Sequence, residues 1–356
     1  MQGLKMSRLL SIANISNYGE ANTALHRHKA LCEIFNNKVD TVDSYFKFTF
    51  LNRVVNKLFS YGINLPFFGV DEINQKIIKK IKQKYYDVVW IDKGIAIKSE
   101  TLKFIKSYSS NTIIIGYSPD EMTQRHNQSA DFLASLPFYD AYITTKSYAI
   151  NDLKKLGAKR VYFVNNAFEP SFHFPRNISD KDRVDLGGEI GFIGMWEADR
   201  ANTILYLADK GLDIRVWGAG KWLQYKNKFP NLRIEDKGLF SEEYSRALGA
   251  FKINLCFLRK MNFDQQTTRS IEIPASGGFM LAERTSEHQN LFEEGVEAEF
   301  FCSNEELYQK CIFYLNNDVT REGIRLAGYN KCLIAGYSNK ETLQKILNVI
   351  LSDFND

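Results

Sequence analysis

The chain has 356 residues, 44% of them hydrophobic, and a formal net charge of +4 at pH 7. This length predicts about two domains with sizeable cores, and the modest charge argues against a nucleic-acid-binding protein, which usually shows a concentrated basic stripe. Five cysteines without a CxxC pair, no signal-peptide pattern and no membrane-spanning run favour a cytoplasmic protein that at most sits on the inner face of the membrane.

Apolar runs alternate with helical stretches in the first half of the chain, which predicts a parallel, doubly wound sheet in an N-terminal Rossmann-like domain, residues 1–170. Strands are expected at residues 8–13, 38–42, 87–92, 111–117, 139–144 and 160–164. Helices are expected at residues 20–35, 71–86 and 148–156. Residues 45–70 lack clean periodicity, and we interpret them as an insertion that shapes an acceptor pocket.

Candidate acceptor-binding residues follow two of these strands, because ligands of open α/β sheets bind beyond the carboxyl ends of the strands. Asn17 and Tyr18 belong to the loop after the first strand. His26, in the next helix, could orient an acceptor hydroxyl, or it could be a solvated or packed histidine. Asp120 ends a Tyr-Ser-Pro-Asp turn and is a candidate catalytic residue that handles the acceptor hydroxyl; the alternative is a turn or capping aspartate.

The polar face of the expected helix at residues 71–86 is rich in lysine, with Lys79, Lys80, Lys82 and Lys84. Such a face is either solvated or in peripheral contact with an anionic membrane. The sequence leaves both interpretations open.

A polar, turn-rich stretch at residues 171–188 is typical of an interdomain linker. It contains Asp180-Lys181-Asp182, formally a DxD motif, but no strand closely precedes it, so we reject a divalent-metal site there. We expect neither a metal nor another cofactor.

The second half, residues 189–335, again alternates strands with helices and predicts a C-terminal Rossmann-like domain. Strands are expected at residues 189–195, 212–218, 252–258 and 279–282, and helices at residues 200–210, 242–250, 305–316 and 320–335. Gly218-Ala219-Gly220 begins like a dinucleotide fingerprint, but position 223 is leucine where the third glycine would stand, so it does not predict NAD binding.

The most informative stretch runs from residue 264 to residue 283 and is predicted to form a loop, a short helix and a buried strand. Thr267 or Thr268 is expected to cap the helix, and Gly277-Gly278 to end it. The free N–H groups and partial positive charge of a helix N-terminus suit a phosphate.

Two charged side chains of this helix extend the phosphate hypothesis. Arg269 lies in the first turn, where a cation is disfavoured unless an anion arrives, and its guanidinium fork suits phosphate oxygens. Glu272 lies one turn later and is expected to face the same cleft.

This stretch resembles the CgeB-like glycosyltransferases of the spore-maturation type, and it is similar to retaining group 1 glycosyltransferases. The matching residues are Arg269, Glu272, Pro274, Ala275, Gly277, Gly278, Glu283, Glu287, His288, Leu291, Phe292, Gly295 and Glu297. The resemblance implies a GT-B fold, an α/β architecture in which two Rossmann-like domains face a cleft. Residues 1–170 would form the acceptor domain and residues 189–335 the nucleotide-sugar donor domain, and a last helix, residues 336–356, would cross back to the first domain.

The resemblance also implies roles for individual residues. Glu272 would bind the nucleotide ribose, and Asp264, which keeps the spacing of a Glu-(seven residues)-Glu signature, would lie near the donor sugar as a catalytic residue. Arg269 would stabilise the departing diphosphate, so that no metal is required. The further donor-binding candidates are Gly194, Arg200, Gly218, Thr267 and Thr268.

The resulting hypothesis is a glycosyltransferase that moves a sugar, with retention, from a nucleotide-sugar donor to a glycan, glycolipid or protein acceptor in cell-surface polysaccharide biosynthesis. A nucleotide-sugar epimerase and a non-catalytic nucleotide-sugar-binding protein of surface assembly are the alternatives. Hydrolysis of the donor without acceptor would favour a transferase, and interconversion of free nucleotide sugars would favour the epimerase. Binding without turnover would favour the third hypothesis.

Overall fold

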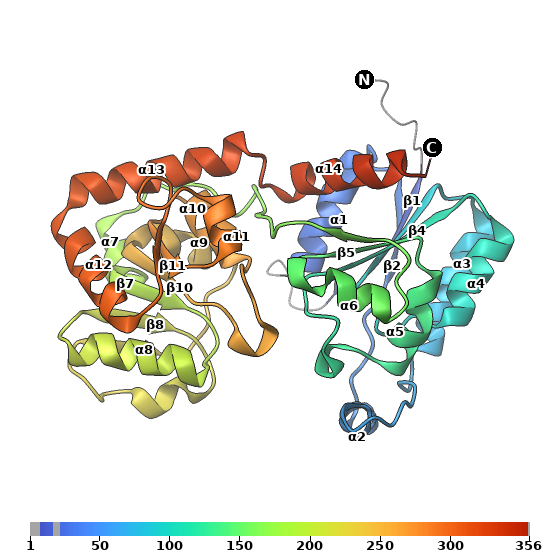
Figure 1. The fold of residues 1–356 in the computed structure, drawn as a ribbon, viewed down its shortest axis with the longest axis horizontal. Helices are drawn as coiled ribbons and strands as arrows, with labels where there is room; N and C mark the ends of the chain where they lie inside the picture. The colour runs from blue at the N-terminus through green and yellow to red at the C-terminus, as the bar shows by residue number, and fades with distance from the viewer. Residues whose placement is uncertain (1–7, 17–21, 355–356) are drawn as a thin grey trace. The chain divides into compact units, whose positions relative to one another are not determined.

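The computed structural model describes residues 8–16 and 22–354, and its chain forms two compact units (Figure 1). The first unit contains the described residues up to Asn165 and those from Asn339 onward, and the second is Asn166–Ser338. Within the described ranges, no helix is both long and apolar enough to cross a membrane.

The first unit is a parallel six-stranded sheet with the strand order β2-β1-β3-β4-β5-β6. Its strands are β1 (Leu9–Ala13), β2 (Val39–Asp43), β3 (Val88–Asp92), β4 (Ile113–Ser118), β5 (Ala141–Thr144) and β6 (Val161–Phe163). Its α-helices are α1 (Thr23–Ile34), α2 (Phe50–Ser60), α3 (Asp71–Gln83), α4 (Ser99–Tyr108), α5 (Ala130–Ser135), α6 (Ile150–Lys155) and α14 (Asn339–Ser352). All six strands expected in this half are confirmed.

Successive residues of a strand point to opposite faces of the sheet, and these strands are apolar at successive positions, so both faces of the sheet are apolar. On one face, Leu9 and Trp90 pack in a core cluster with residues of α1 and α14. On the other face, Leu10 and Ile91 pack in a cluster with residues of α3, α4 and α5. The C-terminal helix α14 is therefore an integral part of the first unit.

Helix α2 lies in the segment to which the sequence pattern assigned no element. The hydroxyl of Thr49 caps α2 by accepting from the N–H of Asn52 at 3.3 Å. Asn52, Val55 and Phe59 recur at helical spacing and are buried, but large apolar residues also occupy the outer face. Apolar side chains on both faces obscured the helical periodicity of the sequence. The acceptor-shaping role of this segment stays a prediction.

The second unit repeats the architecture with the strand order β12-β11-β10-β7-β8-β9, again all parallel. Its strands are β7 (Gly188–Ile193), β8 (Ile214–Trp217), β9 (Leu232–Glu235), β10 (Phe251–Cys256), β11 (Met280–Glu283) and β12 (Glu299–Phe301). Its α-helices are α7 (Asp180–Asp185), α8 (Ala198–Asp209), α9 (Ser241–Ala250), α10 (Arg269–Ala275), α11 (Ser286–Leu291), α12 (Asn304–Asn316) and α13 (Asp318–Ile334). The four strands expected from the sequence are confirmed, and β9 and β12, which it missed, are the short strands at the two edges of the sheet.

The formal DxD motif lies at the start of α7 within the second unit. Ser179 accepts from the N–H of Asp182 at 3.1 Å, and the Asp182 carboxylate accepts from the N–H of Ser179 at 3.0 Å, so the two residues form a capping box. Helix capping therefore explains the position of this aspartate. Across the described residues, no group of three or more His, Cys, Asp or Glu side chains is arranged to hold a metal ion.

Candidate active site

A pocket of about 590 Å³ lies in the second unit, between the start of α8 and the loop that leads into α10. Both segments follow the carboxyl ends of central strands, β7 and β10, which is where ligands of open α/β sheets bind. Four of the predicted site residues line this pocket, namely Arg200, Asp264, Thr267 and Arg269. The other lining residues are Met195, Trp196, Glu197, Ala198, Asp199, Arg259, Lys260 and Met261.

The pocket contains buried hydrogen-bond donors that the protein leaves unused. The Nε atoms of Arg200 and Arg269 and the indole nitrogen of Trp196 are all buried without a hydrogen-bond partner among the described residues. A buried N–H that has lost water and gained no partner is costly, and such groups are rare in native proteins. An anionic ligand in the pocket would supply the missing acceptors.

The arginines of this pocket also lack a full set of counter-charges. Burial lowers the pKa of the Arg200 guanidinium, and the nearby positive charges of Arg269 and Arg259 lower it further, against the effect of Glu197. The Glu197 carboxylate lies 3.6 Å from Arg200 and 3.1 Å from Arg259, so a single negative charge is shared by two arginines. Arg269 makes no ion pair within the described part of the chain. The pocket is thus electrostatically suited to a negatively charged group.

The predicted donor-site glycines, Gly194 and Gly218, pack closely at the ends of β7 and β8, and Gly194 lies beside Arg269. A Cβ atom at Gly194 would lie 3.2 Å from Nη2 of Arg269 and 2.7 Å from the Phe192 ring. A Cβ atom at Gly218 would overlap the carbonyl oxygen of Gly194, which already accepts from the Trp222 indole at 3.0 Å. The two glycines therefore allow the close approach of the chain after β7 to the chain after β8, and direct donor contacts from them stay a prediction.

The capping prediction for α10 is wrong. Thr268 precedes the helix with φ −56° and ψ −37°, which is already helical, and makes no side-chain capping hydrogen bond. A capping side chain needs an extended backbone at this position. Instead, the hydroxyl of Ser270 accepts from the N–H of Thr267 at 3.0 Å and lies 2.6 Å from Nε2 of His288. Ser270 and His288 therefore fix the loop that carries Thr267, so the N–H of Thr267 is not free for a phosphate.

The end of α10 is as predicted. Gly277 has φ +72°, and the N–H of Gly278 donates to the carbonyl of Ile273 at 2.9 Å, which is the hydrogen bond of a Schellman motif. Strand β11 then begins at Met280 in the core of the unit. The double glycine thus fixes the direction in which the chain leaves the site.

Glu272 lies on α10 but does not line the pocket that contains Arg269. Its carboxylate is nearly buried and accepts from the hydroxyl of Tyr244 at 2.8 Å, while Nε2 of His173 lies 3.8 Å away. Burial raises the pKa of Tyr244 well above its usual value, and the Glu272 carboxylate adds to this effect. Tyr244 and His173 were missed because nothing in the local sequence links them to Glu272. The ribose-binding role of Glu272 stays a prediction.

In the first unit, Asp120 lies just beyond the end of β4 and forms an ion pair with Lys93, which follows β3. Burial alone would raise the pKa of Asp120, but Lys93, Lys146 and Arg27 outweigh it, and the pKa lies below its usual value. Asp120 is therefore ionised at neutral pH and can accept a hydrogen bond from a hydroxyl. Whether that hydroxyl belongs to an acceptor stays a prediction.

Arg27 and Asp92 form a buried ion pair near Asp120, which the sequence did not predict. The guanidinium of Arg27 donates to both carboxylate oxygens of Asp92, at 2.7 and 2.9 Å, and lies 4.5 Å from the centre of the Tyr117 ring. His26, next to Arg27 in α1, is buried, as expected for a packed histidine. Asn17 and Tyr18 lie outside the described residues.

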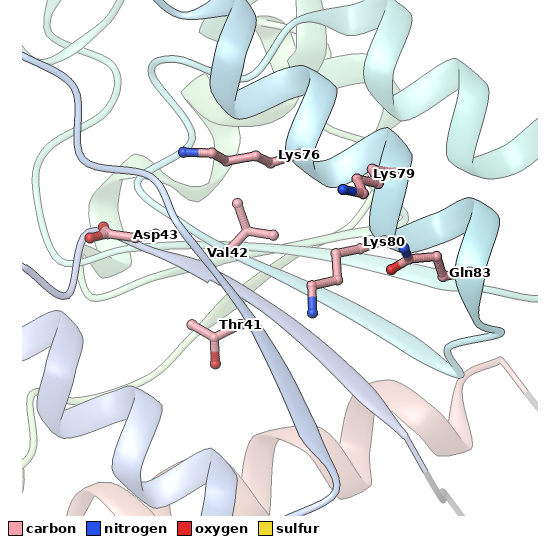
Figure 2. Close-up of a pocket in the computed structure, with 7 residues that line it drawn as sticks. All are labelled: Thr41, Val42, Asp43, Lys76, Lys79, Lys80 and Gln83. Atoms are coloured by element: carbon pink, nitrogen blue, oxygen red, sulfur yellow. The ribbon is translucent and has the colours of Figure 1, made fainter.

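A second pocket, of about 400 Å³, lies between α3 and β2 in the first unit (Figure 2). Lys76, Lys79 and Lys80 project from one side of α3 above Thr41 and Asp43. The lysine face predicted from the sequence is partly neutralised by a neighbouring acid that the sequence pattern did not reveal. Asp40 lies 2.6 Å from Lys84 and 3.7 Å from Lys80, and hydrogen bonding to Lys84 lowers its pKa.

Comparisons with known proteins agree with this architecture. A family model described as "Glycosyl transferase-like" matches residues 200–348, a range that includes Arg200, Asp264 and Arg269 of the pocket. No curated protein sequence matches the chain.

Solved structures match the chain over nearly its full length. HepE of Anabaena in complex with UDP shares 13% identity at a TM-score of 0.60, over 97% of this chain and 100% of that one. Sucrose-phosphate synthase of Thermosynechococcus elongatus shares 10% identity at a TM-score of 0.63, over 98% and 99% of the two chains. A putative UDP-N-acetylglucosamine 2-epimerase of Listeria monocytogenes shares 11% identity at a TM-score of 0.57, over 98% and 97%. The predicted α/β fold of the GT-B type is thereby confirmed.

Proposed function

We propose that this chain is a glycosyltransferase that uses a nucleoside diphosphate sugar as donor and a hydroxyl of a glycan, glycolipid or protein as acceptor. The observation that carries the proposal is the pair of buried, unpartnered guanidinium N–H groups of Arg200 and Arg269 at one pocket of the second unit. The glycosyltransferase-like family match covers the same residues and supports it.

The chemistry of glycosyl transfer explains why such a pocket would be useful. As the bond between the sugar and the diphosphate breaks, negative charge grows on the departing diphosphate, and fixed cations and N–H dipoles stabilise it. Arg200 and Arg269 supply the cations. The start of α8, a helix of 12 residues, adds backbone N–H groups and a partial positive charge at the same pocket.

UDP is the first donor nucleotide to test, because HepE, which has the same fold, has been solved in complex with UDP and with UDP-glucose. In the proposed arrangement, the diphosphate lies against Arg200 and Arg269, and Asp264, which lines the same pocket, lies near the donor sugar. The Glu272 carboxylate would accept hydrogen bonds from the ribose hydroxyls, which would replace the hydrogen bond that it now accepts from the Tyr244 hydroxyl.

The finer points of the proposal rest on the sequence. The Asp264–Glu272 spacing supports transfer with retention, and the match around Arg269 and Gly277 supports the CgeB-like type. The arginine pocket supports a reaction that needs no divalent metal. We further propose a cytoplasmic role in cell-surface polysaccharide biosynthesis.

Epimerisation of a nucleotide sugar is the second candidate, because a putative UDP-N-acetylglucosamine 2-epimerase has the same fold. An epimerase interconverts free nucleotide sugars and releases no UDP when its cycle is complete. Incubation of the protein with UDP-sugars, followed by separation of the nucleotides, distinguishes the two: release of UDP supports a transferase and a new UDP-sugar supports an epimerase.

Calorimetric titration with UDP and with uridine tests the pocket itself. We expect UDP to bind far more tightly than uridine, and Arg200→Ala to remove most of that difference. Arg183→Ala is the matched control, because Arg183 is an exposed arginine of the same unit that lies outside the pocket. Equal affinities for UDP and uridine in the unaltered protein would contradict the proposal.

A further inference from the structure

The longest stretch of exposed apolar residues in the first unit is the segment at residues 44–70, here called the apolar segment, which contains α2. Figure 1 shows α2 at the lower end of this unit, set apart from its sheet. Nine large apolar side chains of the segment are exposed: Tyr45, Phe48, Phe50, Leu51, Val54, Tyr61, Ile63, Leu65 and Phe68. Single exposed apolar residues are ordinary, but a contiguous group of this kind marks an interaction surface.

The inner side of α2 is firmly attached, so the exposed side chains are not the result of a loose loop. The Asn52 side chain exchanges two hydrogen bonds with the backbone of Phe68, at 2.8 and 3.1 Å. The Arg125 guanidinium donates to the carbonyl of Phe59 at 2.7 Å and stacks 4.0 Å from the centre of its ring. The apolar segment is therefore held in place by specific contacts with the rest of the first unit.

The outer side of α2 combines apolar and basic residues. Phe50 is 77% exposed, and Val54, one turn later, extends the same stripe, with Leu51 beside it. Arg53 and Lys57, also one turn apart, flank this stripe and are exposed. A helix on the surface of a soluble unit normally turns a polar face outward, whereas α2 is apolar inside and apolar-basic outside.

The charge of the apolar segment is of one sign. Residues 44–70 contain Lys47, Arg53 and Lys57 and not one aspartate or glutamate. The lysines that line the neighbouring pocket, Lys76 and Lys79, follow in α3, which begins directly after the segment (Figure 2). Exposed aromatic and aliphatic side chains together with basic residues suit the boundary between anionic head groups and acyl chains.

We propose that the apolar segment docks the protein on the surface of an anionic lipid bilayer, with Phe50, Leu51 and Val54 at the level of the acyl boundary and Arg53 and Lys57 at the phosphates. The sequence left open whether the lysine face of α3 is solvated or contacts an anionic membrane, and on that face Asp40 engages Lys80 and Lys84. A second copy of the chain fits this surface less well, because a symmetric contact would oppose the basic residues of one copy with those of the other. The proposal goes beyond glycosyl transfer and does not depend on it.

Co-sedimentation of the full chain with lipid vesicles tests the proposal. We expect binding to vesicles of phosphatidylcholine mixed with phosphatidylglycerol, little binding to phosphatidylcholine alone, and weaker binding at high salt. Arg53→Gln combined with Lys57→Gln should weaken binding about twenty-five-fold, from roughly fivefold for each basic residue removed. Phe50→Ser combined with Leu51→Ser should weaken it at least about tenfold.

Matched controls separate this surface from general effects of charge and hydrophobicity. Lys154→Gln with Lys159→Gln removes two exposed charges elsewhere in the first unit, and Val319→Ser with Ile334→Ser removes two exposed apolar residues of α13. Both should bind vesicles like the unaltered protein. All variants should keep the unaltered melting temperature, because every changed side chain is exposed.

Three results would overturn the proposal. The first is no binding to vesicles of either composition. The second is equal binding of the Phe50→Ser, Leu51→Ser variant together with loss of binding in a Lys76→Gln, Lys79→Gln variant, which would place the contact on α3. The third is a concentration-dependent dimer, measured by sedimentation velocity without lipid, that the Phe50→Ser, Leu51→Ser variant no longer forms; this would assign the surface to a second copy.

Discussion

Replacement of Arg269 by alanine provides the most direct test of the candidate active site. The Nε of Arg269 is buried without a partner in the described structure, and Arg269 lies close enough to Arg200 to lower the pKa of that guanidinium. Without a ligand, Arg269→Ala therefore removes an unsatisfied donor and a like-charge repulsion. We expect the melting temperature of the free protein to stay the same or to rise slightly.

Donor binding should respond in the opposite direction. One charged hydrogen bond is worth about 2–3 kcal/mol, so loss of the Arg269 contact should weaken UDP binding on the order of a hundredfold. Turnover should fall as well, because the negative charge on the diphosphate grows as the sugar departs. The affinity for uridine, which has no diphosphate, should hardly change.

The assay is calorimetric titration of UDP and uridine into both proteins, combined with thermal unfolding without ligand. Arg183→Ala serves as the control for loss of a positive charge from the same unit. A structural role for Arg269 makes the opposite forecast, namely a lower melting temperature with unchanged UDP affinity. That result would refute the assignment of the pocket to the donor diphosphate.

Four further predictions follow from the same structure. Glu272→Gln should raise the donor KM more than it lowers kcat, as steady-state kinetics would show, because Glu272 is assigned to the ribose and not to the departing group; a drop in kcat at constant KM would contradict this. Activity should persist in EDTA, and restoration of lost activity by manganese or magnesium would overturn the metal-independent proposal. The product should keep the anomeric configuration of the donor, and an inverted anomer detected by NMR would disprove retention. Burial lowers the pKa of His288, which is hydrogen-bonded to Ser270, so the unfolded state takes up a proton first as the pH falls. Thermal stability should drop below about pH 6.5, and His288→Asn, measured over the same pH range, should show a weaker dependence, with the part due to His28, whose pKa burial also lowers, retained.

The sequence by itself determined the parts of the fold that depend on local patterns. Strands such as β1 and β3 are short runs of apolar residues, and a strand that is buried on both faces must have this composition. The end of α10 was predictable for a similar reason, since Gly277 adopts φ +72° at the position where a Schellman motif favours glycine. Arg200, Asp264 and Arg269, singled out as candidates, do line one pocket.

Tertiary structure decided the contacts between residues that are distant in the sequence. Tyr244 and Glu272 are 28 positions apart, and Arg27 and Asp92 are 65 apart, so no local pattern reveals their hydrogen bonds. Helix α2 was missed because burial depends on what lies beside a helix, and α2 is apolar on its exposed side as well. The unpartnered Nε of Arg269 is likewise a property of its surroundings: the sequence supplies the guanidinium, and only the folded chain shows that no acceptor of the described structure reaches this atom.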